Sequence, residues 1–116
     1  PETLLLHLGR FQGMWGEEKS HKKIKIPDEI YLKTHKQNKE GILEEKSRKI
    51  KYQLKSAILH LGPSAQSGHY VAYSFHGNKK NKKILQYDDN RITEIKKPLD
   101  NLYRNGYILA YEKNGL

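Results

Sequence analysis

Two apolar runs joined by a short polar loop constrain the fold of this chain more than any other feature. The first run, HYVAYSF, covers residues 69–75, and the second, ILQYDD, covers residues 84–89. The intervening HGNKKNKK contains a Gly-Asn pair. Two such runs, separated by a short loop with glycine and asparagine, predict an antiparallel β-hairpin.

The register of this hairpin decides which polar side chains meet. A turn centred on residues 78–79 would set Phe75 opposite Lys82 and His69 opposite Asp88. Directly opposed residues point to the same face, with Cβ atoms about 5 Å apart. That separation lets a carboxylate bond an imidazole nitrogen, so the spacing predicts a contact between His69 and Asp88.

In this register the neighbouring Asp89 would point to the opposite face, where it could bond backbone or the loop at Arg91. Asp89 also leaves an alternative open. A register shift of one residue would bring Asp89 opposite His69 and turn Asp88 to the other face. The spacing alone is equally compatible with a surface histidine that merely faces a turn aspartate.

Residues 67–73, SGHYVAY, followed by residues 84–93, ILQYDDNRIT, resemble the histidine box of the ubiquitin-specific proteases. These are papain-like cysteine peptidases that remove ubiquitin from proteins. The family pattern reads Gly-His-Tyr, an apolar strand, and then Trp-x-x-aromatic-Asp/Asn-Asp-x-x-Val. The tryptophan position holds Ile84 here, a departure that affects packing rather than chemistry. The matching residues are Gly68, His69, Tyr70, Tyr87, Asp88 and Asp89, with Ile92 as a conservative match.

Four further segments extend the resemblance over nearly the whole chain: LLLHLGRF (4–11), KKIKIP (22–27), YQLKSAILHLG (52–62) and GYILAYEK (106–113). The resemblance implies an α+β, mainly antiparallel β fold, the palm-like sheet of a papain-like cysteine peptidase with one short helix. Residues 1–116 would form the C-terminal part of the catalytic domain. The cysteine-bearing helical thumb and the zinc fingers of the family would be missing.

The apolar pattern along the chain predicts six or seven strands and one short helix. A change of phase near residues 55–56 indicates either a bulge in the longest strand or a strand that changes partner. Polar or glycine-rich stretches predict inserted loops at 9–21 and 33–48 and a cleft loop at 62–68. In the first loop, Trp15 is either an exposed contact point or packs back onto the sheet. The predicted strands are 3–8 (expected to be buried), 22–26, 49–61, 69–75, 84–89, 91–95 and 107–112, and the helix is 99–104, following Pro98.

The chain contains no cysteine. This excludes disulfides, thiolate-zinc sites and a cysteine nucleophile within these residues. The resemblance therefore implies half of a catalytic triad: His69 as general base and Asp88 as its orienting residue, with Asp89 polarising the site or taking over that role. No H-x-x-x-H, Gly-Lys-Ser/Thr or G-x-S-x-G pattern occurs, so we expect no metal site and no cofactor. The substrate-binding residues implied are Phe11, Ser67, Gly68 and Tyr70, beside a channel for the two glycines that end ubiquitin.

The formal net charge of +9 is concentrated in four lysine-rich runs. A basic surface favours acidic partners such as nucleic acid. The runs lie in predicted loops and carry no interleaved aromatic residues, so we favour solvated loops and rank nucleic-acid binding third among the functional hypotheses. The runs are residues 19–25, 33–39, 46–51 and 79–83.

Two hypotheses of different classes lead. In the first, the chain is the histidine-bearing half of a deubiquitinating peptidase that cleaves isopeptide or peptide bonds after the C-terminal glycine of ubiquitin. Its partners would be the ubiquitin tail, ubiquitinated proteins and the N-terminal, cysteine-containing half of the domain. In the second, the missing cysteine marks a non-catalytic ubiquitin-binding or scaffold module. The sequence has no signal peptide and no apolar run long enough to span a bilayer, so we expect no membrane partner and a cytoplasmic or nuclear location.

Overall fold

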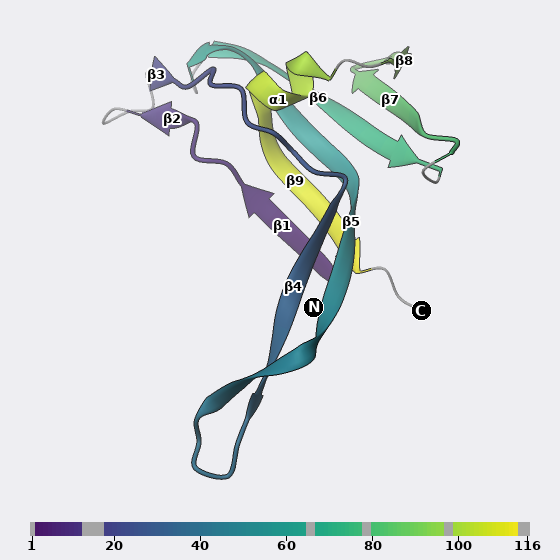
Figure 1. The fold of residues 1–116 in the computed structure, drawn as a ribbon. Coiled ribbons are helices and arrows are strands. Elements are labelled where there is room, and N and C mark those ends of the chain that lie inside the picture. Colours follow the sequence, from purple (N-terminus) through teal and green to yellow (C-terminus); the bar gives the residue numbers. More distant parts are fainter. Residues whose placement is uncertain (1, 13–17, 65–66, 78–79, 97–98, 114–116) are drawn as a thin grey trace.

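The computed structural model in Figure 1 describes residues 2–12, 18–64, 67–77, 80–96 and 99–113. Its main element is a seven-stranded antiparallel sheet. Six of the strands follow the order β1-β9-β5-β6-β7-β8, and the seventh, β4, pairs with β5 outside this order. Strands β2 and β3 form a separate two-stranded sheet. The predicted α+β, mainly antiparallel fold is confirmed. The elements are β1 (Thr3–His7), β2 (Phe11–Gln12), β3 (Glu18–Lys19), β4 (Glu29–Gln37), β5 (Leu43–Ser64), β6 (Ser67–His76), β7 (Lys83–Asp88), β8 (Arg91–Ile95), α1 (Asp100–Asn105) and β9 (Gly106–Lys113).

Strand β5 is the central element because it pairs along both of its edges. One edge pairs with β9, and the other pairs first with β4 and then with β6. The register with β9 shifts between Leu54 and Ser56, which confirms the predicted bulge. The extra residue changes which positions point inward. Leu54 and Ala57 are therefore both buried although they lie three residues apart.

The core lies on one face of the sheet, where α1 and the segment before β4 pack against the strands. Leu102 of α1 and Ile26 of that segment belong to it. On β9, the Tyr111 hydroxyl donates to the carbonyl of Pro27 at 2.8 Å. Burial and the nearby charge of Asp28 raise the pKa of Tyr111 to about 12. The buried apolar residues are Ile26, Tyr52, Leu54, Ala57, Leu59, Val71, Tyr73, Ile84, Leu99, Leu102, Leu109 and Tyr111.

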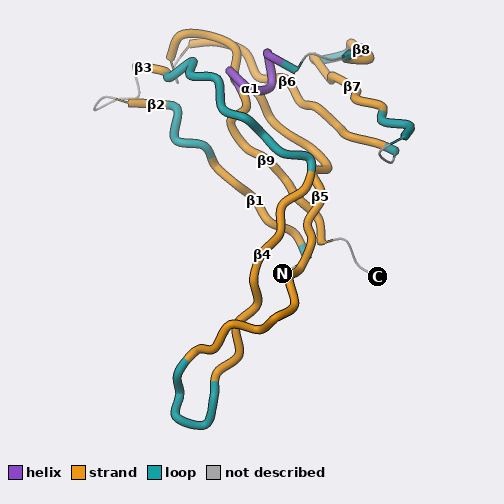
Figure 2. The backbone as a smooth tube through the Cα atoms, in the orientation of Figure 1, coloured by secondary structure: helices purple, strands orange, loops and turns teal. Residues whose placement is uncertain are grey.

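Strand β4 and the first half of β5 form a hairpin arm, residues 29–53, that projects from the sheet (Figures 1 and 2). The prediction of an inserted loop at 33–48 is wrong, because most of that stretch belongs to the two strands of the arm. Tyr31 and Leu32 point to opposite faces of the arm, and both are exposed. Where both faces of a strand pair meet solvent, as at these two residues, polar and apolar residues need not alternate, and the usual strand signal is missing from the sequence.

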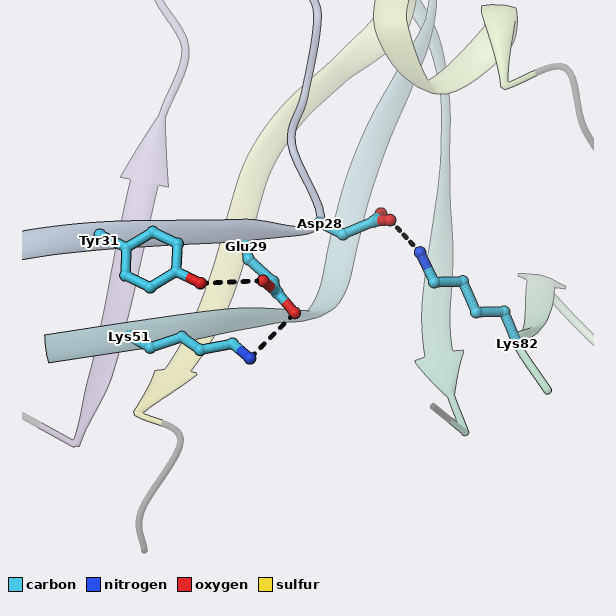
Figure 3. Close-up of polar contacts among 5 residues, drawn as sticks. All are labelled: Asp28, Glu29, Tyr31, Lys51 and Lys82. Carbon is cyan, nitrogen blue, oxygen red and sulfur yellow. Dashed lines mark hydrogen bonds and ion pairs between the residues drawn. The ribbon is translucent and has the colours of Figure 1, made fainter. Parts of the chain in front are cut away.

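Ion pairs surround the root of the arm (Figure 3). The Glu29 carboxylate forms an ion pair with Lys51 at 3.1 Å, which joins the two strands of the arm. It also accepts a hydrogen bond from the Tyr31 hydroxyl at 3.3 Å. Asp28 forms an ion pair with Lys82, just before β7. The start of the arm is thereby linked to the hairpin of β6 and β7.

Three further expectations are corrected. The segment 22–26 forms no strand, and the backbone N–H of Ile24 instead donates to the carbonyl of Tyr103 at 3.0 Å. Strand β1 is not buried: it lies at an edge of the sheet, where Leu5 is 70% exposed. The predicted cleft loop at 62–68 is largely taken up by the end of β5 and the start of β6.

The last part of the chain follows the prediction closely. Strand β8 has the predicted bounds, and α1 and β9 begin and end within one residue of theirs. Trp15, Pro98 and the turn at 78–79 lie outside the described residues. In the part of the chain that the structure describes, no helix is long and apolar enough to cross a membrane.

Candidate active site

The hairpin of β6 and β7 brings His69 and Asp88 together, although its register differs from the predicted one. Phe75 lies opposite Ile84 rather than Lys82, a shift of two residues. Side-chain direction alternates with a period of two, so a two-residue shift keeps Asp88 on the same face as His69. The Nε2 atom of His69 lies 2.5 Å from Oδ1 of Asp88. The predicted contact is therefore present, but it runs diagonally across the two strands.

Asp89 lies closer to this pair than alternation along a strand predicts. Asp88 pairs with Arg91, which leaves Asp89 in a two-residue turn with a φ of +53°. At this left-handed position the strand alternation no longer holds, and the expectation that Asp89 faces away is wrong. One carboxylate oxygen of Asp89 lies within 4.8 Å of both the His69 ring nitrogen and an Asp88 oxygen. Two carboxylates therefore surround one imidazole.

The carboxylates control both the protonation and the tautomer of His69. The hydrogen bond and the charge of Asp88 raise the pKa of His69, and the charge of Asp89 raises it further. An ionised carboxylate only accepts, so Nε2 of His69 carries the hydrogen that it donates to Asp88. In the neutral ring, Nδ1 is then the atom with a lone pair. The His69 side chain is 46% exposed, so a reacting group can approach it.

An aromatic cluster surrounds His60 near the start of β6. The His60 ring is buried and meets the ring of Phe11 edge to face at 5.0 Å between centroids, and that of Tyr70 at 4.9 Å. Tyr107 lies 5.1 Å from Phe11 and 6.4 Å from Tyr70. Tyr70, which directly follows His69 in β6, is 50% exposed, so the cluster presents an aromatic surface to solvent.

Gly68 has to be a glycine. Its φ is +129°, and a Cβ there would lie 2.3 Å from the carbonyl oxygen of Leu61 and 2.9 Å from the ring of His60. Of the four predicted substrate-binding residues, Phe11, Gly68 and Tyr70 are thus gathered around His60. Ser67 begins β6 next to them, and its side chain is outside the described set.

Two buried cations beside this cluster were not found from the sequence. Arg10 is 1% exposed and donates to four backbone carbonyls, those of Gly106 (2.5 Å), Ser20 (3.3 Å), Lys22 (2.9 Å) and Tyr103 (2.7 Å). Lys19, assigned to a solvated lysine run, is 9% exposed. For Arg10, the available signal was its position two residues after an apolar run. Nothing in the local sequence distinguishes Lys19 from its exposed neighbours.

The same sheet carries an exposed apolar row on the face that does not hold the core. Each member of the row is paired in register with the next across neighbouring strands. Ile58, Tyr87 and Ile92 are 39%, 37% and 63% exposed. Rows of apolar side chains on a monomer surface are typical of contact sites. The row consists of His7, Ile108, Ile58, Ala72, Tyr87 and Ile92.

Comparison with protein-family models matches residues 1–111 to the ubiquitin carboxyl-terminal hydrolases. The chain belongs to this family. Ubiquitin carboxyl-terminal hydrolase 20 of Arabidopsis thaliana is 33% identical over 99% of this chain. Ubiquitin carboxyl-terminal hydrolase 10 of Saccharomyces cerevisiae is 33% identical over 97% of it. The resemblance found in the sequence is thereby confirmed.

Solved structures share the fold of this hydrolase chain at lower identity. A structure of the SAGA DUB module bound to ubiquitin aldehyde matches with a TM-score of 0.73 and 23% identity, covering all of this chain and 25% of that one. An essential yeast splicing factor matches with a TM-score of 0.64 and 20% identity, covering 99% of this chain and 25% of that one. This chain spans only 16% and 13% of the Arabidopsis and yeast hydrolases, so their activities belong to much longer proteins.

Proposed function

We propose that this chain is the C-terminal, histidine-bearing part of a deubiquitinating cysteine peptidase domain, which cleaves isopeptide or peptide bonds after the C-terminal glycine of ubiquitin. The observation that carries the proposal is the 2.5 Å contact between His69 Nε2 and Asp88 Oδ1 within a hydrolase-family fold. In this proposal His69 is the general base and Asp88 its orienting residue.

The chemistry follows from the tautomer. A thiol attacks an amide carbonyl well only as a thiolate, and a neighbouring imidazole accepts its proton. Nδ1 of His69 accepts that proton while Asp88 holds the opposite edge of the ring and stabilises the imidazolium that forms. Asp89, close to both groups, adds negative charge that favours the same cation. The proton then passes to the leaving amine.

The nucleophile comes from a further portion of the protein, because these 116 residues hold no cysteine. The exposed apolar row, with Ile58, Tyr87 and Ile92, supports such a portion, since it leaves part of the sheet available for packing. The small fraction of the relatives' length that this chain spans supports it as well. The chain alone is expected to be inactive.

The substrate in this proposal is the slender C-terminal tail of ubiquitin. Phe11 and Tyr70 form the walls of its channel, and Gly68 and Ser67 lie beside it at the start of β6. Gly68 adds no side chain to this border, so the proposed channel suits narrow residues such as the two glycines that end the tail. Ubiquitinated proteins are the wider substrate class. The proposal includes a cytoplasmic or nuclear location, in line with a splicing factor among the proteins that share the fold.

The test is hydrolysis of a fluorogenic substrate attached to the C-terminus of ubiquitin. We expect no turnover by this chain alone, and turnover when it is combined with the cysteine-bearing portion of a relative's catalytic domain. The matched control is the same portion with its cysteine changed to alanine. An assembly that binds this chain and the substrate but hydrolyses nothing would contradict the proposal.

A non-catalytic ubiquitin-binding or scaffold module is the second candidate. One observation favours it: a protein described as a splicing factor has the same fold over nearly the whole chain. Such a module needs the aromatic surface but has no chemical use for an oriented His69. It therefore predicts that His69→Ala leaves every function of the full protein intact, whereas the first candidate predicts the loss of hydrolysis with binding retained.

A further inference from the structure

Among the residues that the structure describes, Lys19 is a buried cation whose two hydrogen-bond acceptors carry no charge. Its ammonium group donates to the backbone carbonyl of His60 and, at 2.8 Å, to Oδ1 of Asn105. Both acceptors are neutral. The side chain is 9% exposed. A lysine held in this way is tied to two fixed points of the fold, β5 and the end of α1, rather than to solvent.

Burying this charge costs free energy that a methionine or leucine would not. Burial lowers the pKa of the Lys19 amine, and the charge of nearby Arg10 lowers it further. Buried cations are usually paired with a carboxylate or replaced by an apolar residue of similar volume. An apolar side chain would fill the same space at a lower cost, so we infer that the ammonium group of Lys19 has a role beyond packing. Its direct effect is on the position of the atoms it binds.

The atoms that Lys19 holds belong to the centre of the aromatic cluster. In the small sheet of β2 and β3, Lys19 lies directly opposite Phe11. Lys19 binds the carbonyl of His60, and Phe11 packs on the ring of the same residue at 5.0 Å. One pair of opposed residues thus fixes both the backbone and the side chain of His60.

On the other side of His60 are the remaining residues of the proposed channel. The ring of Tyr70 meets the His60 ring at 4.9 Å with an interplanar angle of 72°. Gly68 lies so close that an added Cβ would stand 2.9 Å from that ring. The buried His60 ring therefore sits between Phe11 and Tyr70 and sets the distance between them.

We propose that Lys19 is a positioning residue of the substrate channel: by holding the backbone of His60 it fixes the ring that spaces Phe11 from Tyr70. This inference rests on the proposed function, in which those two residues form the channel walls. His60 is the spacer, and neither residue touches the reacting atoms. Neither Lys19 nor His60 was predicted from the sequence as a residue of the site.

The test compares Lys19→Met, which keeps the length and removes the charge, with Lys22→Met on the neighbouring exposed segment. Nuclear Overhauser contacts of the His60 ring with Phe11 and Tyr70 report the spacing in this chain. We expect Lys19→Met to weaken the Phe11–His60 contacts and shift the Tyr70 ring signals, with Lys22→Met unchanged. In the same samples, affinity for ubiquitin should fall about tenfold, as for loss of one hydrogen bond to a charged group.

A destabilising control separates positioning from general stability. Tyr111→Phe removes a hydrogen bond far from His60, so it should lower the melting temperature and leave the ring contacts unchanged. If Lys19→Met fails to fold, Asn105→Ala decides, since it removes one of the two acceptors of Lys19 and should produce a smaller shift of the same ring signals. Asn101→Ala, which removes the acceptor of the other Asn105 hydrogen bond, is its control and should leave the ring signals unchanged. Unchanged ring contacts in the variant that folds would overturn the inference. If the unmodified chain does not bind ubiquitin, that result counts against the proposed function. The ring contacts would still show whether Lys19 fixes the position of the His60 ring.

Discussion

Two regions of the molecule place lysine in different surroundings. One is the end of the sheet near His69, and the other is the hairpin arm. Lys19 is buried beside His60 and binds neutral oxygens, whereas Lys51 on the arm is paired with Glu29 at 3.1 Å near solvent (Figure 3). Both lysines belong to runs that look alike in sequence. The difference shows that charge along a chain does not determine which cations are buried, because that depends on the carbonyls that distant strands place around them.

The two regions also differ in what fixes their backbone. At the site end, Arg10 and Lys19 bind carbonyls or an amide of β5, α1, β9 and the segment after β3, so distant parts of the chain are joined. In the arm, the two strands pair chiefly with each other. We therefore expect single substitutions to have large effects at the site end and small ones in the arm.

The largest expected effect is that of Arg10→Met. It removes four hydrogen bonds to backbone carbonyls, of which that of Tyr103 keeps another donor, the N–H of Ile24. Each of the other three unmet buried hydrogen bonds costs about 1 kcal/mol, so the free energy of unfolding should fall by about 3 kcal/mol. Denaturant unfolding measures it. The control is Arg104→Met, whose exposed contact at 3.4 Å should be worth less than about 0.5 kcal/mol. Equal losses in the two variants would refute the role of Arg10.

Gly68→Ala follows, with an expected loss of about 2 kcal/mol, because it combines a strained φ with a collision against backbone. Gly9→Ala is the matched control, since a Cβ at Gly9 meets nothing within 4 Å. Thermal unfolding of both variants gives the comparison. If Gly68→Ala were as stable as Gly9→Ala, the close approach of Gly68 to His60 would be wrong.

Substitution of one tyrosine in the body of the sheet and one in the arm compares the contributions of the two regions to stability. Tyr111→Phe removes a part-buried hydrogen bond to Pro27 and should cost about 1 kcal/mol. Tyr31→Phe removes an exposed contact to Glu29 and should change stability by less than about 0.3 kcal/mol. Denaturant midpoints at constant slope measure both. A larger loss for Tyr31→Phe would show that the arm contributes more to the fold than its exposure indicates.

The smallest expected effect on stability concerns pH. The pKa of His69 is raised in the folded chain by Asp88, so the stabilisation by this pair is complete below the unfolded pKa of about 6.5 and is lost as pH rises through the folded pKa. An NMR titration should place the His69 midpoint above about 6.5 and lower it in Asp88→Asn. Asp100→Asn, which removes an exposed carboxylate paired with Lys23, should leave it unchanged. A midpoint insensitive to Asp88→Asn would contradict the contact.

The sequence predicted those parts of the fold where burial imposes a pattern. The bulge near Ser56, strand β8 and the His69–Asp88 contact all follow from apolar periodicity or spacing. The hairpin register was wrong by two residues, and the contact survived because an even shift preserves the face. The stretch 33–48 of the arm was missed because its sequence shows no alternation of polar and apolar residues. Asp89 was misplaced because its positive φ breaks the alternation on which the prediction relied.

Buried polar residues mark the limit of sequence reasoning for the site. Arg10 and Lys19 are held by carbonyls that come from residues far along the chain, and no local pattern encodes those partners. His60 is similar, since its neighbours Phe11 and Tyr70 come from different strands. The sequence predicted the residues of the family motif, but it did not predict the buried polar residues that pack against them or bind their backbone.

Turnover of a ubiquitin C-terminal fluorogenic substrate, in the assembly with a cysteine-bearing portion, tests the central claim most directly. We predict that His69→Ala abolishes hydrolysis and that Asp88→Ala lowers turnover by about 10²-fold or more, because orientation of the ring and stabilisation of the imidazolium are lost together. Asp88→Asn should be milder, since an amide oxygen still accepts from Nε2–H. Hydrolysis that survives His69→Ala would contradict the assignment of the general base, and a greater loss in Asp89→Ala than in Asp88→Ala would exchange the roles of the two carboxylates.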